Sequence, residues 1–365
     1  MSNIESIQPQ KDLERVRDLS LLFGPTGFEG AVTDYIENEI KGACDSLCRD
    51  RMGNLICLIR TGDPDAQDRQ KIMLSAHTDE VGFMITEICE DGLLRFDTLG
   101  GINVSVLEGR CVTVGDERGL VEGLVASKAI HHIERADRDK PNKISKLCID
   151  IGAKDKEEAE KYVSVGSVGT FRSEFYLFGE STEYMKGKAL DDRVGCAALM
   201  EVMERIYADR PEGNADLYFC FTVREEIGLS GAKVAAQRIK PDVAIVLECT
   251  AIADLPDTDP ARRVADVGKG GALSLADRST IYDRVLITKA LEIAKERDIP
   301  VQVKRYVSGG NDAGSIHKTG VGVRPLALSV PTRYLHSPSC VCAVSDFRAV
   351  CRLTEELVRE CGSLF

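Results

Sequence analysis

Five residues that can bind metals or move protons stand at the ends of short apolar runs. His77 follows KIMLSA, Glu225 and Glu226 follow DLYFCFTV, Glu248 ends DVAIVLE, and His336 comes shortly after RPLALSV. Runs of this kind, bounded by turn residues, predict β-strands, so these side chains are expected at the carboxyl ends of strands. In an open parallel α/β sheet, that edge is where sites assemble.

Two aspartates join this group. GKALDDRVG places Asp191 and Asp192 at the start of a predicted helix, at the same edge of the sheet. Aspartate there is also a favoured N-cap, which alone stabilises a helix by about 1 kcal/mol. Asp79 lies two residues after His77, on the same face if the strand continues, where its carboxylate can orient the imidazole.

Imidazole nitrogen and carboxylate oxygen are the usual ligands of Zn²⁺ and similar ions where no thiolate takes part. One carboxylate can bridge two ions about 3.5–4 Å apart, so one shared acid, two histidines and two further acids suffice for two ions and leave one glutamate free. Each residue also has an ordinary explanation, as a buried histidine, a helix cap or a solvated acid. Glu248 is the exception, because a carboxylate ending a buried strand needs a partner.

The elements that would position these residues predict an α/β fold. GPTGFEG separates two helices between residues 12 and 40, and strands are expected at 55–60 and 71–76. After about residue 181 strands and helices alternate, which implies a mostly parallel sheet with helices on both faces. The predicted helices there are 191–209, 231–239, 280–297, 312–319 and 346–359, and the strands are 216–223, 242–248, 301–307 and 323–330.

Residues 80–180 have a different pattern. Runs such as GFMITEI, CVTVGD and GLVEGLVAS place β-formers between glycines, with a single helix-like piece, KDKEEAEKYV. This predicts a β-barrel or sandwich, inserted into a catalytic domain made of residues 1–79 and 181–365.

Composition excludes several classes of protein. The chain has 365 residues and a net charge of −12, which disfavours nucleic-acid binding. No apolar run approaches the roughly 18 residues that span a bilayer, and the N-terminus shows no secretory signal, so a cytoplasmic protein is expected. Its 13 cysteines are scattered without a CxxC pair and are interpreted as reduced, mostly core thiols.

Several motifs, in this order and spacing, resemble one family. They are GPTGFEG, GNLI, HTDEVGFMI, CIDIGA, KALDDRVGCAAL, REEIGLSGA, SGGNDAGSIH and RYLHSP. The chain resembles, over nearly its whole length, the dinuclear metallo-aminopeptidases of the glutamyl aminopeptidase and tetrahedral-aminopeptidase type, some of which have been labelled endoglucanases.

The resemblance implies a role for each candidate residue. Asp191 would bridge two ions, with His77 and Glu248 completing the ligands of one ion and Glu226 and His336 those of the other. Glu225 would be the general base, and Asp79 the partner of His77. Asp312, in SGGNDAGSIH, is expected near the substrate pocket. The position of Glu248 is often aspartate in this family, and GSVGTF in the insert lacks an aspartate that relatives commonly carry.

The function that follows is a metal-dependent aminopeptidase with two divalent ions per chain, Zn²⁺ first and Co²⁺ or Mn²⁺ as alternatives. The resemblance also implies a homo-oligomer built from dimers through the insert, up to a dodecamer, acting on peptides. A deacylase of N-acyl amino acids remains an alternative. A glycosidase ranks lower, since retaining enzymes need facing carboxylates about 5–5.5 Å apart while adjacent residues of an extended chain diverge. A non-catalytic scaffold would lack a ligand or base, and none is missing.

Overall fold

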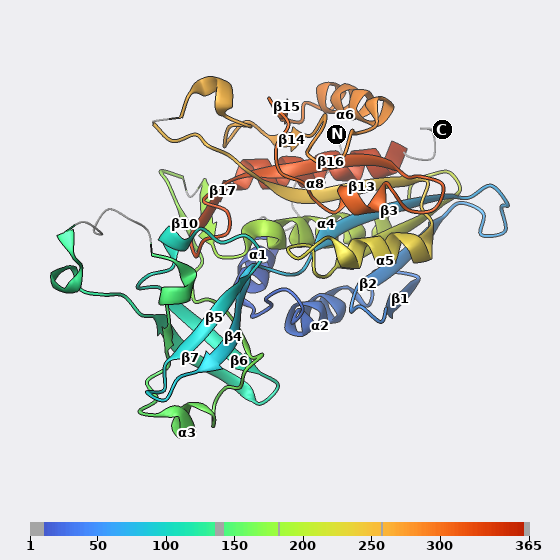
Figure 1. Cartoon of the computed structure of the whole chain (residues 1–365). Coiled ribbons are helices and arrows are strands. Elements are labelled where there is room, and N and C mark those ends of the chain that lie inside the picture. The colour runs from blue at the N-terminus through green and yellow to red at the C-terminus, as the bar shows by residue number, and fades with distance from the viewer. Residues whose placement is uncertain (1–10, 136–141, 182, 257, 361–365) are drawn as a thin grey trace.

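The computed structural model describes residues 11–135, 142–181, 183–256 and 258–360 (Figure 1). A large β-sheet with helices on both faces is joined to a closed β-barrel. The predicted α/β fold with an inserted barrel is therefore confirmed. The first ten residues, part of the stretch in which no secretory signal was recognised, lie outside the described residues. Within those ranges, no helix is both long enough and apolar enough for a membrane span.

Four parallel strands form the centre of the large sheet. In spatial order they are β12 (Ala215–Thr222), β3 (Gln70–His77), β13 (Val243–Ala251) and β16 (Arg324–Arg333). Helices cover both faces, so nearly every residue of β13 and β16 is buried, and their sequences are mostly apolar. Parallel pairing brings the carboxyl ends of all four strands to one edge.

The strands at both margins of the sheet are antiparallel. They are β1 (Ser46–Arg49) and β2 (Leu55–Thr61) on one side, and β17 (Cys340–Ala343), β11 (Tyr184–Gly187) and β10 (Tyr176–Phe178) on the other. In addition, β14 (Gly271–Leu273) pairs antiparallel with β16, and β15 (Val301–Val303) pairs parallel with β14. β10 falls within the predicted insert but pairs with β11 of the large sheet. Alternation of side chains signals a strand without indicating which sheet it joins.

The helices pack in two layers (Figure 1). On one face α4 (Leu190–Ala208) lies against β3 and β13 and contacts α1 (Lys11–Leu21), α2 (Gly30–Ile40) and α8 (Val344–Glu360). On the other face α5 (Ser230–Ile239) packs on β12 and β3 and contacts α7 (Ala313–Ile316). α6 (Arg284–Glu296) lies beside α8 and β16.

Three elements are shorter than the sequence predicted. The helix expected from residue 280 begins at Arg284, because the carboxylate of Asp283 accepts the N–H groups of Val285 and Leu286 and so caps it. The strand expected over 301–307 ends at Val303, and the helix expected over 312–319 is the single turn α7. Of the residues left over, Lys304 and Tyr306 line the cavity described below.

The barrel has its own hydrophobic core. Its strand order is β4-β5-β8-β7-β6-β9, and Phe83 packs edge-on against Phe96 and Phe171 with ring centroids 5.3 Å apart in each pair. The strands are β4 (Gly82–Ile88), β5 (Leu94–Leu99), β6 (Cys111–Asp116), β7 (Gly119–Val125), β8 (Ile149–Asp150) and β9 (Val168–Phe171). Short helical turns are η1 (Val104–Val106), η2 (Ile130–His132), η4 (Ile144–Lys146), α3 (Lys156–Ala159) and, outside the barrel, η5 (Pro260–Arg262).

A buried cluster of charges joins the barrel to the large sheet. Oε1 of Glu80 lies 2.5 Å from Nζ of Lys188 and 3.5 Å from a guanidinium nitrogen of Arg193, and Oε2 accepts a hydrogen bond from the Thr170 hydroxyl of β9 at 2.7 Å. All three charged residues are buried, with at most 4% of their surface exposed. A buried charge is costly without a partner, so these contacts fix where the barrel begins.

We predict that Glu80→Gln lowers the free energy of unfolding by about 3–5 kcal/mol, because Lys188 and Arg193 would stay buried without a counter-charge. Denaturant unfolding measures the change. Glu90→Gln is the matched control, since the Glu90 side chain is 92% exposed and its contact with Lys156 is 3.6 Å long. That surface pair should contribute less than about 1 kcal/mol. Equal stability of the two variants would contradict the prediction.

Candidate active site

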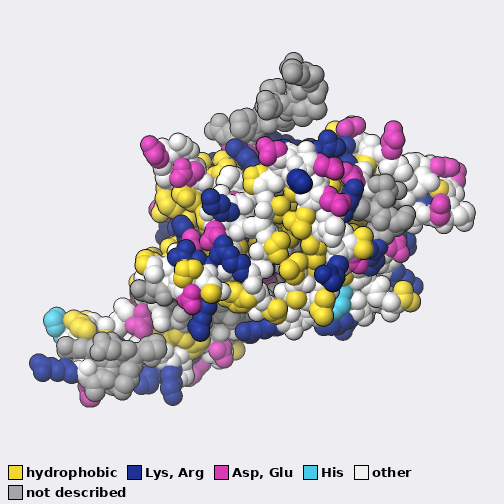
Figure 2. Space-filling model, turned by 90° about the horizontal axis from the view of Figure 1, so that it is seen from above, with side chains coloured by type: hydrophobic (Ala, Val, Ile, Leu, Met, Phe, Trp, Pro, Cys, Tyr) yellow, Lys and Arg dark blue, Asp and Glu magenta, His cyan; other side chains and the backbone are white. Residues whose placement is uncertain are grey.

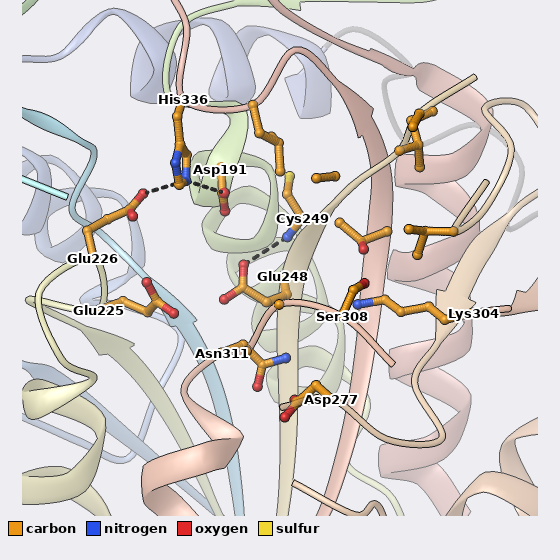
Figure 3. A pocket seen from close by; sticks show the side chains of 18 of the residues that line it. Asp191, Glu225, Glu226, Glu248, Cys249, Asp277, Lys304, Ser308, Asn311 and His336 are labelled. Carbon is orange, nitrogen blue, oxygen red and sulfur yellow. Dashed lines mark hydrogen bonds and ion pairs between the residues drawn. The ribbon is translucent and has the colours of Figure 1, made fainter. Parts of the chain in front are cut away.

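The predicted histidines and acids surround one cavity at the carboxyl edge of the sheet (Figure 3). The cavity has a volume of about 430 Å³. The predicted residues that line it come from strand ends, from the loop after β16 and from the start of α4, as the topology of a parallel sheet favours. They are His77, Asp191, Glu225, Glu226, Glu248 and His336.

Asp191 stands between the two histidines. Its Oδ1 lies 3.3 Å from Nε2 of His77, and its Oδ2 lies 3.5 Å from Nε2 of His336. Burial alone would raise the pKa of Asp191, but hydrogen bonds from His336 and His77 hold it below its usual range. One carboxylate thus presents a different oxygen to each imidazole.

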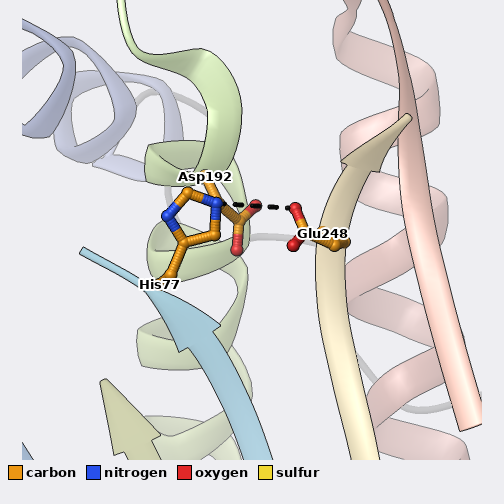
Figure 4. A group of neighbouring side chains, drawn as sticks. All are labelled: His77, Asp192 and Glu248. Carbon is orange, nitrogen blue, oxygen red and sulfur yellow. Dashed lines mark ion pairs between the residues drawn. The ribbon is translucent and has the colours of Figure 1, made fainter. Parts of the chain in front are cut away.

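His77 ends β3, and its ring lies beside Glu248 and Asp192 (Figure 4). Nε2 is 3.6 Å from Oε2 of Glu248, and Nδ1 is 3.4 Å from Oδ1 of Asp79. Burial would lower the pKa of His77, yet the charge of Glu248 and hydrogen bonds to Asp191 and Asp79 raise it well above its usual value. Asp192, also drawn in Figure 4, is fully buried beside this pair.

His336 reaches the cavity from the loop after β16. Its Nε2 lies 3.4 Å from Oε1 of Glu226, and its Nδ1–H donates a hydrogen bond to the carbonyl of Gly101 at 2.6 Å. That bond leaves Nε2 to face the acids when the ring is neutral. Burial would lower the pKa of His336, but Asp191 and Glu226 raise it to about 9. Gly101 belongs to the barrel segment, a contribution that the sequence did not indicate.

Asp79 has a second role beside its contact with His77. Oδ1 accepts the backbone N–H of Glu225 and Oδ2 that of Glu226, both at 3.0 Å. Burial would raise the pKa of Asp79, and the hydrogen bond to His77 together with these N–H donors lowers it. The predicted partner of His77 therefore also holds the backbone of the adjacent glutamates.

The three glutamates are crowded and poorly solvated. Burial, as the largest cause, raises the pKa of Glu226 to about 8 and that of Glu248 to about 7, and it raises the pKa of Glu225 well above its usual value. Glu225 and Glu226 point in different directions from consecutive residues (Figure 3).

A divalent cation fits this set of donors. In four groups of the described residues, one ligand atom per residue lies within 4.8 Å of the others; two of these groups are His77–Asp192–Glu248 and Asp191–Glu226–His336. Imidazole nitrogen and carboxylate oxygen suit transition metals, and a cation would offset the buried negative charge.

Asp312 follows a residue of the cavity lining but does not line the cavity itself. It is buried, and its Oδ2 accepts a hydrogen bond from the Thr222 hydroxyl at 2.7 Å, beneath the end of β12. Its neighbour Asn311 lines the cavity in its place. His317 hydrogen-bonds to the Ala313 carbonyl, and His131 and His132 lie in η2 of the barrel, away from the cavity lining.

Loop residues that the sequence did not single out complete the cavity. Lys304 extends along its wall toward Ser308, and Asp277 lies nearby (Figure 3). Burial lowers the pKa of Lys304. No periodic pattern marks these loops, so a charged residue in them gives no signal of its position. In the described ranges the cysteines are free thiols, and most are buried.

A family model matches this chain over residues 53–353, and its description is M42 glutamyl aminopeptidase. The chain belongs to this family. Membership confirms the resemblance and the predicted class of enzyme, an aminopeptidase and thus a hydrolase.

Relatives in the family share the length of the chain as well as its fold. The lysyl aminopeptidase of Pyrococcus furiosus is 31% identical, over 92% of this chain and 94% of its own. A TET aminopeptidase from a marine sediment archaeon of the Thaumarchaeota is 35% identical over 96% of both chains, with a TM-score of 0.90. The TET1 peptidase of Pyrococcus horikoshii, which can assemble into a tetrahedron or a large octahedral shell, is 33% identical over 96% of this chain and 99% of its own, with a TM-score of 0.84.

We predict that Asp79→Asn lowers aminopeptidase activity and metal affinity by about 10–100-fold. An amide has one acceptor oxygen, so it cannot accept the N–H groups of both glutamates and also face His77 with a charge. Steady-state kinetics and metal titration measure the two effects. Asp97→Asn, an exposed change on β5, is the control and should leave both unaltered. Wild-type kinetics in Asp79→Asn would rule out this role.

Proposed function

We propose that this protein is a two-metal aminopeptidase that removes residues one at a time from the N-terminus of peptides. The observation that carries the proposal is the pair of contacts made by Asp191, one oxygen toward His77 and the other toward His336. Each histidine also faces an acid of its own, Glu248 or Glu226. This arrangement is the one expected for two ions that share the Asp191 carboxylate while each ion has two further ligands of its own.

The residues that line the cavity provide ligands for two divalent ions per chain. His77, Asp191 and Glu248 would hold one, and Asp191, Glu226 and His336 the other. Ions bound there would polarise the substrate carbonyl and acidify a water molecule, as Zn²⁺ does, and Co²⁺ and Mn²⁺ suit the same ligands. Glu248 lines the cavity, although glutamate is one methylene longer than the aspartate that the family often has at this position.

Glu225 is the proposed general base. Its carboxylate accepts the proton of the water that attacks the carbonyl carbon of the first peptide bond, and a carbon–oxygen bond forms. Glu225 then gives that proton to the leaving nitrogen as the carbon–nitrogen bond breaks. Burial raises the pKa of Glu225, and the hydrogen bond from Glu225 N–H to Asp79 fixes its backbone.

The cavity favours a substrate with a free amino end. The α-ammonium group of a peptide can lie beside one of the acids near the ions, so the first peptide bond comes next to Glu225. Lys304 and Asp277 present both signs of charge in the same cavity, so a substrate panel needs acidic, basic and aliphatic first residues.

We also propose a homo-oligomer built from dimers, with the barrel as the dimerisation domain and a dodecamer as the full assembly. The relatives known as TET peptidases support this. So do exposed hydrophobic residues on the barrel, Leu120, Leu124, Ile130 and Val165. Figure 2 shows further hydrophobic side chains gathered on the face that carries α6 and β14, where Leu275, Ile281 and Val285 are exposed. A monomeric mass by light scattering would rule out the assembly.

Stripping the protein with EDTA and restoring each metal tests the proposed chemistry. We expect hydrolysis of aminoacyl-anilides to disappear on stripping and to return with Zn²⁺, Co²⁺ or Mn²⁺, because the carboxylates alone cannot polarise a carbonyl. N-acetylated amino acids and cellulose oligomers belong in the same panel. Turnover of those substrates alone would favour a deacylase or a glycosidase.

The Glu225→Gln variant separates the base from the ligands. It should lose at least about 10²–10⁴-fold in kcat, since the amide cannot take a proton, while the metal content stays at two ions per chain. Glu87→Gln, an exposed change on β4, is the matched control. Substantial residual activity in Glu225→Gln would refute the assignment.

A further inference from the structure

Four consecutive backbone N–H groups after β12 bind buried side chains. β12 ends at Thr222, so the N–H groups of the following residues have left the regular strand. The donors are Val223, Arg224, Glu225 and Glu226, and the acceptors, in the same order, are Asn54, Glu29 and the two oxygens of Asp79, each at 3.0 Å. The segment that carries the proposed base is thus held by side chains.

Glu29 is the acceptor whose position needs an explanation. It is 5% exposed, and its Oε1 accepts the N–H of Gly27 at 2.7 Å and that of Arg224 at 3.0 Å. Glu29 occupies the N-cap position of α2, but its side chain makes no capping hydrogen bond. Burial, and then the charge of Asp79, raise its pKa. Burying a carboxylate costs free energy, and Glu29 does not offset that cost by capping α2.

The turn that carries Glu29 is attached to the residue after Asp79. Thr26 N–H donates to the Glu80 carbonyl at 3.0 Å, and Glu80 N–H donates to the Gly24 carbonyl at 3.1 Å. Glu29 and Asp79 therefore belong to one hydrogen-bonded unit.

Arg224 is the point at which that unit bends the chain. Its φ is 56°, a left-handed conformation that residues other than glycine seldom adopt. Its side chain is exposed, so its backbone contacts hold this conformation: the N–H donates to Glu29 at 3.0 Å, and the carbonyl accepts the N–H of Ser230 at 3.3 Å. Such strain persists only where the surroundings enforce it.

We propose that Glu29 is a positioning residue for Glu225. By accepting the N–H of Arg224, Glu29 sets the direction in which the chain leaves β12, and so aims the carboxylate of Glu225 into the cavity. This inference rests on the proposed function, because it takes Glu225 as the base. It assigns a role to the GPTGFEG motif, which otherwise lies outside the cavity lining.

The test compares Glu29→Ala with Glu29→Gln in the metal-loaded, full-length protein. Glutamine keeps Oε1 as an acceptor for both N–H groups, whereas alanine removes it. We expect Glu29→Ala to lower kcat by about 10–100-fold with little change in KM, because a displacement of about 1 Å suffices for that loss. Glu29→Gln should retain most of the wild-type kcat, and both variants should keep the wild-type metal content.

Hydrogen exchange gives a readout that does not depend on activity. The amides of residues 223–226 should lose protection in Glu29→Ala and keep it in Glu29→Gln. Glu37→Ala, the same substitution on α2 where the side chain pairs with Arg49 at the surface, is the control and should change neither kcat nor exchange. If Glu29→Ala fails to fold, Glu29→Asp takes its place, because a side chain one methylene shorter cannot reach both N–H groups.

Unchanged kcat and exchange in the alanine variant, or a glutamine variant as impaired as alanine, would overturn the inference. Full activity in Glu225→Gln would instead overturn the proposed function.

Discussion

Mutual repulsion among buried carboxylates is the constraint that the architecture has to satisfy. Asp191, Glu225, Glu226 and Glu248 share one cavity with two imidazoles. Burial opposes the ionisation of each acid, and neighbouring negative charges oppose it further. Positive charges and N–H donors are therefore needed beside these acids. The imidazoles face Asp191 from both sides, and the donor set leaves room for ions to offset the remaining charge.

The fold meets this requirement with backbone as much as with side chains. Parallel strands end together at one edge and leave N–H groups without sheet partners there. After β12 those groups bind Asn54, Glu29 and Asp79, three buried side chains from distant parts of the sequence. These contacts fix the loop that carries Glu225 and Glu226, and each buried acid that accepts an N–H gains a donor in the same contact.

The residues of the site could be predicted because strand ends are visible in a sequence. KIMLSA and DVAIVLE are apolar runs that stop at His77 and Glu248, and topology alone brings such ends together. Their supports could not be predicted in the same way. One example is the hydrogen bond that Arg224 N–H donates to Glu29, and another is the hydrogen bond between His336 and the Gly101 carbonyl. Both depend on three-dimensional proximity, which the pattern of side chains along the sequence does not indicate.

The fold, like the site, could be predicted from the sequence only in part. The central strands and the long helices α4 and α8 follow from hydrophobic pattern. That β10 belongs to the large sheet depends on its pairing with β11, which the sequence does not reveal. The late start of α6 depends on the cap made by Asp283.

The hydrogen bond between His336 and Gly101 gives the barrel a part in the candidate active site. At 2.6 Å, one carbonyl of the barrel segment fixes the rotation of an imidazole that belongs to the other domain. Gly100, beside it, passes so close to Val81 and Glu226 that a β-carbon there would come within 2.8 Å of Val81. The orientation of this ring therefore depends on where the barrel segment lies, and the link between them is a single backbone oxygen.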